Sequence, residues 1–343
     1  MNPLIKSPKF TEKFDFASKH WVNENLTLKI PQDFPTIPKA LSYLNDKVWS
    51  KATTVTLLID SGIHDVTSFG QMNVAHDIVI KGKTTVTKTI TGLVSVTGSA
   101  GNWLVTYNVS DITDLTAGML VNIQSTTGTG DYNHHRGCWE ITALPTSTRI
   151  TVKNTNRKAT FTSTVTAGTI IVPLTQLKTT SNIGIFYLKN CSVGLSDIAL
   201  KGNSLGPDYT NTAINSNDSI LTPKNIGINS FYCGFNSINQ AGVHAPIQFT
   251  PYILSISNCQ QGILGQGIKL TYRSIQVTGC GQLGLLAIMD HCEVSSSTSC
   301  FLGNTMDIQA QANAYVHVSG TIYETTSPAV NTIGNGNSYI STF

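Results

Sequence analysis

Residues 254–302 read LSISNCQQGILGQGIKLTYRSIQVTGCGQLGLLAIMDHCEVSSSTSCFL, and this stretch repeats one pattern. Three of its four cysteines, Cys259, Cys280 and Cys300, lie 21 and 20 residues apart, and short apolar segments stand between them. A repeat of this length is typical of one solenoid coil. The stretch therefore predicts parallel β coils stacked from about residue 181 to the end. The same spacing predicts that six of the seven cysteines form a buried ladder at turns.

The composition favours β structure. Only 12% of the residues are Asp, Glu, Lys or Arg, about half the share of roughly 25% found in ordinary globular proteins. Polar runs such as 124–128 and 295–299 consist of Ser, Thr, Gln and Gly, which suit turns and extended chain. A helix-rich fold is therefore unexpected.

One segment near the N-terminus is helical in pattern. Apolar residues recur at steps of three or four, at Ile37, Leu41, Leu44 and Val48, and such spacing places them on one face of a helix. A short buried-type strand at 55–59 follows. Because the first coil of a solenoid has an uncovered apolar end, we expect this helix to cover it.

The middle of the chain has a different pattern. Apolar and polar residues alternate in several short segments between about 94 and 177, and turn-forming residues separate these segments. Such spacing predicts an antiparallel barrel or sandwich inserted between early coils.

Two motifs resemble a known family. The order Phe34-Pro35-Thr36-Ile37, Ala40-Leu41 and Leu44, followed by a strand that ends at Gly62, is similar to the N-terminal segment of many bacteriophage tailspikes and other pectate-lyase-like β-helices. The stretch 129–140 resembles a stretch of phage tail-fibre proteins. The resemblance implies an all-β right-handed parallel β-helix with an N-terminal capping helix and an inserted antiparallel β module.

The expected organisation has four parts. They are a tail-attachment arm at 1–33, the capping helix and first coils at 34–93, the inserted module at 94–180, and a receptor-facing β-helix at 181–343. A disordered terminus is the alternative for the first part, because termini without a partner surface are often poorly ordered.

The charge and cysteine patterns exclude several kinds of partner. The net charge is +3 without a cluster of Lys and Arg, so no nucleic acid is expected. The chain lacks a secretory signal and an apolar run of about 18 residues. We therefore expect that it does not insert into a membrane and that it assembles in the bacterial host cytoplasm. No C-x-x-C pair is present, and we expect neither a metal nor another cofactor.

Carboxylates are the first candidates for chemistry. Glycoside hydrolysis needs two carboxyl groups roughly 5–10 Å apart, and adjacent coils lie about 4.8 Å apart. Asp290 and Glu293 form the densest acidic cluster of the repeat region, and Asp307 follows at nearly one coil's distance. The alternative is that these are ordinary solvated carboxylates, which is the interpretation we favour.

A second cluster of titratable residues lies in the middle of the chain. It comprises Asp131, His134, Arg136 and Glu140, together with His135 and Trp139. It could be a general acid–base site or a metal site. We favour a structured loop, in which Trp139 is packed and Arg136 pairs with Asp131 or Glu140.

Four tyrosines suggest a binding surface. Tyr209, Tyr232, Tyr252 and Tyr272 are spaced 23, 20 and 20 residues apart, which is close to the coil period. Aromatic faces stack on sugar rings, so the tyrosines could line a carbohydrate-binding stripe. A purely structural stacking ladder would have the same spacing.

These features and the resemblance together imply a function. We expect a homotrimeric tail fibre or tailspike subunit in the virion tail, docked on a tail or baseplate protein through its N-terminal arm. It would bind a bacterial surface receptor that is a polysaccharide. The alternatives are a polysaccharide depolymerase, either hydrolase or lyase, on the same fold, and a cellular pectate-lyase-like enzyme.

Overall fold

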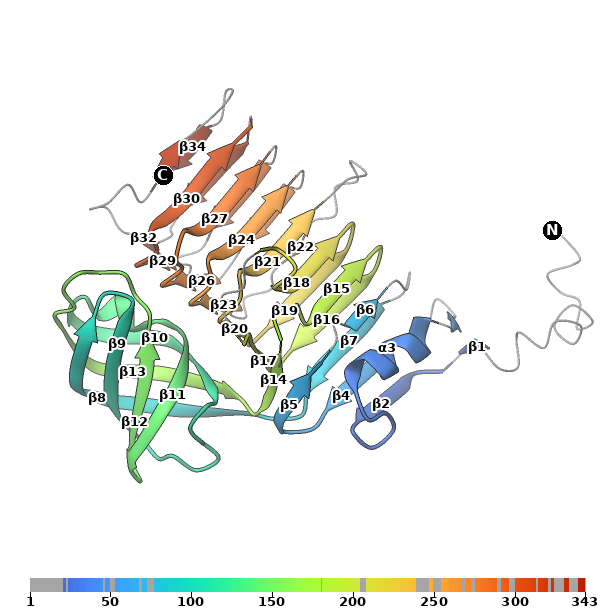
Figure 1. The fold of residues 1–343 in the computed structure, drawn as a ribbon, viewed down its shortest axis with the longest axis horizontal. Coiled ribbons are helices and arrows are strands. Elements are labelled where there is room, and N and C mark those ends of the chain that lie inside the picture. Colours follow the sequence, from blue (N-terminus) through green and yellow to red (C-terminus); the bar gives the residue numbers. More distant parts are fainter. Residues whose placement is uncertain are drawn as a thin grey trace, which may run out of the picture.

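The fold consists of stacked parallel sheets with a separate barrel beside them (Figure 1). The computed structural model describes residues 21–342 except 23, 46, 50–52, 68–69, 73–76, 180, 204–207, 239–246, 249–253, 267–268, 273–274, 289–290, 296–299, 313, 320–321, 324–329 and 333–338. Within these residues, successive strands of the stack pass from one sheet to the next and pair in parallel with strands one coil away. An all-β fold with parallel sheets is thus confirmed.

Each coil contributes a strand to each of three faces. The first face, sheet I, contains β5 (Gly62–Val66), β14 (Thr175–Thr179), β17 (Ile198–Lys201), β20 (Ile226–Asn229), β23 (Leu254–Ser257), β26 (Ile275–Thr278), β29 (Cys300–Leu302) and β32 (Ile322–Tyr323). The second, sheet II, contains β6 (Gly70–Met72), β15 (Phe186–Lys189), β18 (Thr212–Asn217), β21 (Cys233–Ile238), β24 (Gln261–Gln266), β27 (Leu283–Ile288), β30 (Met306–Gln311) and β33 (Val330–Thr332).

The third face is built from two shorter sheets. Sheet III contains β2 (Leu26–Ile30), β4 (Val55–Ile59), β7 (Asp77–Gly82), β16 (Ser192–Ser196) and β19 (Ile220–Lys224). Sheet IV contains β22 (Ile247–Gln248), β25 (Lys269–Tyr272), β28 (His291–Ser295), β31 (Tyr315–Ser319) and β34 (Tyr339–Thr342). Two short strands, β1 (Trp21–Val22) and β3 (Val48–Trp49), pair near the N-terminus.

The interior of the stack is one continuous apolar core. Alternate residues of a strand point to opposite faces of a sheet, and the inward positions form rows along the stack. In sheet II one such row is Phe186, Ile214, Phe235, Ile263, Leu285 and Ile308, all buried in the same cluster.

The helix α3 (Ile37–Asn45) lies at the N-terminal end of this core (Figure 1). Its buried residues Ile37, Ala40, Leu41 and Leu44 belong to the same cluster as the strands. The predicted apolar stripe is therefore correct as far as Leu44, whereas Val48 starts β3.

The inserted module is a closed antiparallel barrel, one of the two architectures, barrel or sandwich, that the alternation of apolar and polar residues predicted. Its strands are β8 (Thr85–Ser99), β9 (Asn102–Val109), β10 (Leu120–Gly130), β11 (Gly137–Thr146), β12 (Arg149–Asn154) and β13 (Ser163–Pro173). It leaves the stack after β7 and returns at β14. The strands begin at Thr85 and end at Pro173, whereas the sequence interpretation placed the module at 94–180. The first half of β8, Thr85–Ile90, pairs with β13 and thus belongs to the barrel.

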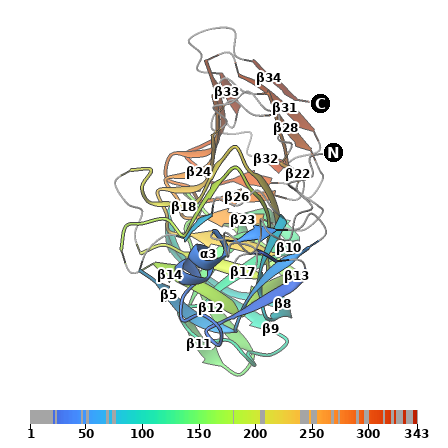
Figure 2. The same cartoon turned by 90° about the vertical axis from the view of Figure 1, so that its right-hand side faces the viewer.

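The barrel packs on the outer face of sheet I (Figures 1 and 2). The Gln176 side chain forms two hydrogen bonds with the backbone of Leu120, of 2.9 and 3.1 Å. Cys138 donates its backbone N–H to Ser257 Oγ at 2.9 Å and accepts a 2.7 Å bond from Asn229 Nδ2. The backbone of the barrel is thereby held by side chains of the stack.

The cysteine ladder predicted from spacing is largely wrong. All six described cysteines, Cys138, Cys191, Cys233, Cys259, Cys280 and Cys300, are free and buried. Only Cys259 and Cys280 occupy neighbouring positions, joined by a backbone bond from Gly281 to Cys259. Cys233 pairs with Gln261, and Cys300 pairs with Gln276 in a different sheet. Coil lengths vary along the stack, so equal spacing in sequence does not give equal register.

Candidate functional site

Two of the four predicted tyrosines form an aromatic corner, Tyr209 with Tyr232, at the start of sheet II strands. Tyr209 lies just before β18 and Tyr232 just before β21. Their ring centroids are 5.0 Å apart with an interplanar angle of 78°, an edge-to-face contact. Tyr209 is 41% exposed, while Tyr232 packs against buried Cys233, Leu264 and Leu286. One ring is thus accessible and the other supports it.

Polar groups surround the exposed ring. The Tyr209 hydroxyl donates to Gln261 Oε1 at 3.0 Å. Partial burial raises the pKa of Tyr209, so the hydroxyl remains a neutral donor. Asp208 accepts bonds from the backbone N–H and the hydroxyl of Thr210, at 2.9 and 2.6 Å, and these bonds lower the pKa of Asp208. The loop therefore presents an aromatic face beside a charged acceptor, a combination suited to a sugar ring and its hydroxyls.

The other two tyrosines do not extend this corner. Tyr272 is in β25 of sheet IV, on a different face of the stack, and its side chain lies outside the described part. Tyr252 is outside the described residues. A single row of four tyrosines is not formed, because Tyr272 falls within a strand while Tyr209 and Tyr232 precede strands.

The candidate carboxylates are not brought together on an exposed surface of the described structure. Asp307 is only 3% exposed, in β30, and accepts a 2.9 Å hydrogen bond from Asn304 Nδ2. Glu293 is in β28, with its side chain outside the described part, and Asp290 lies outside it altogether. Within the described residues, Asp307 is thus a buried carboxylate bonded to a neighbouring amide, and the candidates form no exposed pair of carboxylates.

The residues of the middle cluster are held in the barrel and at its junction with sheet I. Tyr132–His135 form a short 3-10 helix, η2, in which both histidines are buried. Asp131 pairs with Lys158 at 2.9 Å. Partial burial is the largest single influence on Asp131 and disfavours its charged carboxylate, but the bond and charge of Lys158 and the backbone bond from Thr162 together outweigh it and lower the pKa. His134 Nδ1 lies 2.7 Å from Asn156 Nδ2.

The rest of this cluster is also engaged in structural contacts. Trp139 is fully buried and donates its indole N–H to the backbone oxygen of His135 at 2.8 Å. Glu140 pairs with Lys201 of sheet I at 2.6 Å. Arg136 donates to Thr126, rather than pairing with Asp131 or Glu140 as we expected. These residues therefore make structural contacts, as in the packed-loop interpretation. The ion pairs differ from those expected, because Asp131 pairs with Lys158 and Glu140 pairs with Lys201.

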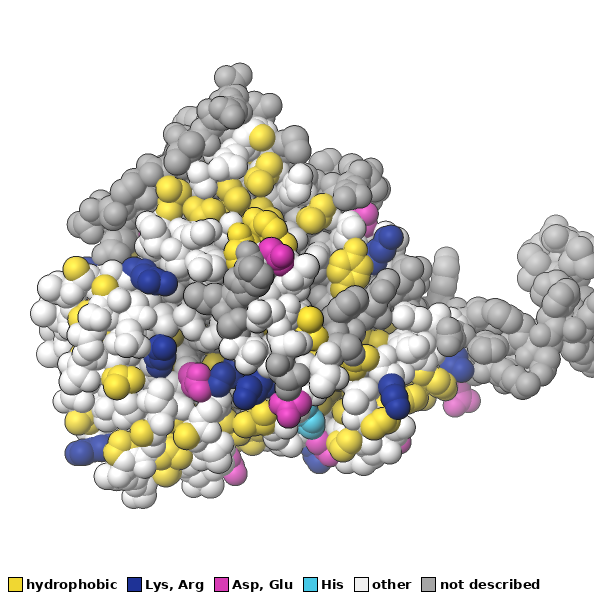
Figure 3. Space-filling model, viewed as in Figure 1, with side chains coloured by type: hydrophobic (Ala, Val, Ile, Leu, Met, Phe, Trp, Pro, Cys, Tyr) yellow, Lys and Arg dark blue, Asp and Glu magenta, His cyan; other side chains and the backbone are white. Residues whose placement is uncertain are grey.

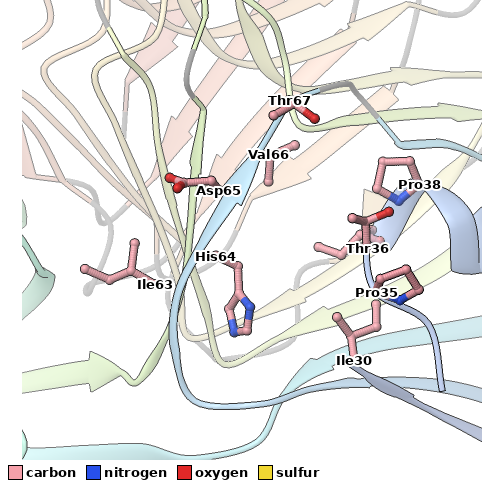
Figure 4. Close-up of a pocket in the computed structure, with 10 residues that line it drawn as sticks. Ile30, Pro35, Thr36, Pro38, Ile63, His64, Asp65, Val66 and Thr67 are labelled. Atoms are coloured by element: carbon pink, nitrogen blue, oxygen red, sulfur yellow. The ribbon is translucent and has the colours of Figure 1, made fainter. Parts of the chain in front are cut away.

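A cavity that was not predicted from the sequence lies near the capping helix. It has a volume of about 270 Å³ and lies between β5 and the start of α3. In Figure 4, His64 and Val66 point toward the helix, whereas Ile63 and Asp65 point to the other side. His64 Nε2 is bonded to the Asp60 backbone oxygen at 2.7 Å. The inward position of His64 follows from its pairing with the core residue Leu177, which only the structure shows, so the sequence alone carries no signal for this cavity.

Two further findings concern metal ligands and membrane-spanning helices. Among the described residues, no group of three or more His, Cys, Asp or Glu side chains is placed to hold a metal ion. In the same part of the chain, no helix has the length and apolar character needed to cross a bilayer.

Comparisons with known proteins give only distant structural likenesses. No protein-family model matches the chain, and no curated protein matches it in sequence. Among solved structures, XylC in complex with xylose has a TM-score of 0.31 and 10% identity, over 89% of this chain and 66% of that one.

Two phage proteins are also similar. The gp54 tailspike of Acinetobacter baumannii bacteriophage AP22, in complex with a capsular saccharide of A. baumannii, has a TM-score of 0.22 and 11% identity, over 84% of this chain and 64% of that one. The tailspike gp61 of Pseudomonas phage phi297 has a TM-score of 0.21 and 8% identity, over 84% of this chain and 65% of that one. The chain spans slightly less than two thirds of the length of each of these three proteins.

Proposed function

We propose that this protein is a subunit of a phage tail fibre or tailspike, and that it binds a polysaccharide on the bacterial surface through a right-handed parallel β-helix. The observation that carries the binding proposal is the Tyr209–Tyr232 corner. Tyr209 is exposed, its orientation is fixed by Gln261 and Tyr232, and Asp208 beside it offers an acceptor. A rigid aromatic face loses little conformational entropy when a sugar stacks on it.

We further propose that three copies associate through the outer face of sheet II. Outward positions of this sheet form the row Asn215, Asn236, Leu264, Leu286 and Gln309. Its two leucines cluster with Cys233 and, at the edge, with Leu283 and Ile288. Figure 3 shows hydrophobic side chains over β24, β27 and β30. The two leucines are each only 6% exposed, but Leu283 and Ile288 beside them are half-buried and leave apolar surface that contact between copies would cover. Residues 1–33 would dock the assembly on the tail.

Binding is favoured over cleavage because the one described candidate carboxylate of the repeat region, Asp307, is buried. The depolymerase alternative predicts shortened polysaccharide chains. The test is to incubate the purified full chain with capsule and O-antigen preparations from a panel of bacteria, and to measure both bound protein and chain length.

We expect adsorption without shortening. Tyr209→Ala should weaken adsorption at least tenfold, which corresponds to a loss of about 1.4 kcal/mol or more. Tyr43→Ala is the matched control, because Tyr43 is another tyrosine that is 37% exposed, on the capping helix. Equal loss in both variants, or no adsorption to any strain, would contradict the proposal. Shortened polysaccharide chains would mean that the protein is a depolymerase rather than only a binding protein.

A further inference from the structure

The barrel wall has an opening between β8 and β13. The ladder between these two strands runs only from the pair Thr85 and Pro173 to the pair Ile90 and Gly168. Beyond this point β8 pairs with β9 alone, and the first residues of β13 pair with β10 alone. The β8–β9 register shifts twice, between Ile90 and Gly92 and between Leu93 and Ser95. Such bulges bend a strand, which explains why β8 leaves β13 here.

A pocket occupies this opening. It has a volume of about 490 Å³ and is lined by Leu93, Val94, Ser95, Val96, Phe161, Thr162, Ser163, Thr164 and Val165. This volume is within the range of small-molecule sites. Its lining combines apolar side chains with four hydroxyls and includes no charged residue. The chemistry therefore suits an uncharged ligand that has both apolar and hydroxyl surface.

Phe161 provides a fixed aromatic wall. It is 8% exposed and lies between two other rings, with centroid distances of 5.8 Å to Trp103 and 4.7 Å to His135. The buried indole Nε1 of Trp103 has no hydrogen-bond partner among the described residues. Trp103 is not among the lining residues, so the inner side of the pocket is closed by the Phe161 ring, of which only a small part is exposed.

A buried chain of hydrogen bonds ends at Ser163. The Tyr107 hydroxyl lies 2.5 Å from His135 Nδ1, and His135 Nε2 lies 2.6 Å from Ser163 Oγ. Burial raises the pKa of Tyr107, and burial lowers the pKa of His135 to about 3. At neutral pH both groups are uncharged, so the imidazole has a single proton.

The direction of this chain follows from the cost of an unpaired buried donor. His135 is the only hydrogen-bond partner of the Tyr107 hydroxyl within the described residues. The phenol must donate to Nδ1, since otherwise its proton would be buried without an acceptor. The imidazole proton is then on Nε2 and is donated to Ser163. Ser163 accepts this bond, and its own proton is available to a ligand in the pocket.

The same direction argues against acyl transfer. A serine beside a histidine that is oriented by a third group is the usual arrangement of an activated nucleophile. Here Nε2 already has the proton, so it cannot take one from Ser163. Burial and the neighbouring His134 outweigh the charge of Asp131, which favours an imidazolium, and keep the pKa of His135 low.

We propose that this pocket binds an uncharged sugar residue, with the exposed Val94 side chain against the apolar face of the ring and Ser163 as a donor to one of its oxygens. The site is on the barrel and separate from the Tyr209–Tyr232 corner. It stands independently of whether the chain belongs to a phage particle.

Saturation-transfer NMR of the full chain with neutral methyl glycosides of hexoses and N-acetylhexosamines tests this site. We expect transfer to at least one glycoside, weakened about fivefold by Ser163→Ala, the loss of one neutral hydrogen bond. Val94→Arg should abolish it, because Val94 is a 40% exposed residue of the lining. Thr166→Ala, on the same strand but outside the lining, is the matched control and should bind normally.

Three results would overturn the proposal. They are the absence of transfer from every glycoside, equal binding by the wild type and Val94→Arg, and hydrolysis of p-nitrophenyl acetate that Ser163→Ala abolishes. Tyr209→Ala should leave this binding unchanged, so failure here is distinguishable from failure of the polysaccharide proposal. Thermal unfolding of each variant shows whether it is folded.

Discussion

Sheets I and II have the same parallel pairing and the same apolar inward rows, but their outward rows differ. The outward row of sheet I is Gln176, Ala199, Gly227, Ser255 and Gln276. That of sheet II is Asn215, Asn236, Leu264, Leu286 and Gln309. The barrel covers the first row, whose small residues and amides allow close approach and bond its backbone. The second row is apolar at its centre. The outward residues of sheet I thus match the barrel that covers it, and the different row of sheet II does not.

The largest effect that we expect is a pH dependence of the stability of the barrel. Burial lowers the pKa of His135 to about 3, below the ordinary 6.5. The unfolded state therefore binds more protons between these values, and stability falls as pH falls through this window. The slope is up to about 1.4 kcal/mol per pH unit, or about 2–3 kcal/mol between pH 6.5 and 4.5.

Urea unfolding of the barrel, followed by the fluorescence of its buried Trp139, measures this loss. The variant His135→Gln should show a flatter dependence on pH over the same range. An equally steep dependence in the variant would refute the assignment of the effect to His135.

A side chain at Gly227 should separate the barrel from sheet I. A Cβ at this position would lie 2.6 Å from Asn122 Oδ1 and 2.9 Å from Cys138 Sγ, both in the barrel. We expect Gly227→Val to cost about 1–3 kcal/mol through overpacking and to increase protease access to the barrel junction. Asn215→Val, in the outward row of sheet II, is the control and should be nearly neutral. Similar costs at both positions would remove the distinction between the two faces.

A polar group on the outer face of sheet II should weaken association between copies. Ile288→Gln replaces a half-buried residue at the edge of the apolar cluster, and covering the rest of this side chain contributes about 1 kcal/mol. Sedimentation analysis should show fewer trimers at a given concentration than with the control Lys224→Gln, an exposed residue of sheet III. An unchanged distribution would mean that this face is not the contact.

The smallest effect should come from the ion pair between the barrel and sheet I. Glu140 and Lys201 are 2.6 Å apart, with side chains 32% and 16% exposed. A double-mutant cycle with Glu140→Gln and Lys201→Met should give a coupling of about 1 kcal/mol or less, and salt should reduce it. A coupling of several kcal/mol would mean that this pair, rather than the amide contacts, holds the barrel.

Much of the fold is predictable from sequence because periodicity reports burial directly. The stripe at Ile37, Leu41 and Leu44 and the alternation after 94 each indicate which side chains are inside. Cysteine spacing failed to give register, since coil length varies: Leu254 pairs with Ile275, 21 residues on, but with Ile226, 28 residues back.

The candidate sites are less predictable because they depend on contacts between distant segments. Tyr209 and Tyr232 were found through their spacing, yet only the structure shows that Gln261 orients Tyr209. The link from Tyr107 through His135 to Ser163 joins three strands or turns of the barrel. Neither the direction of its hydrogen bonds nor the opening beside it has a local sequence signal.

The most direct test of the account is a binding isotherm of the full chain for purified bacterial capsular and O-antigen polysaccharides, with wild type, Tyr209→Ala and Tyr43→Ala measured side by side. The account predicts saturable binding to at least one polysaccharide, weakened at least tenfold by Tyr209→Ala and unaffected by Tyr43→Ala. No binding by wild type, or binding that Tyr209→Ala leaves intact, would contradict it.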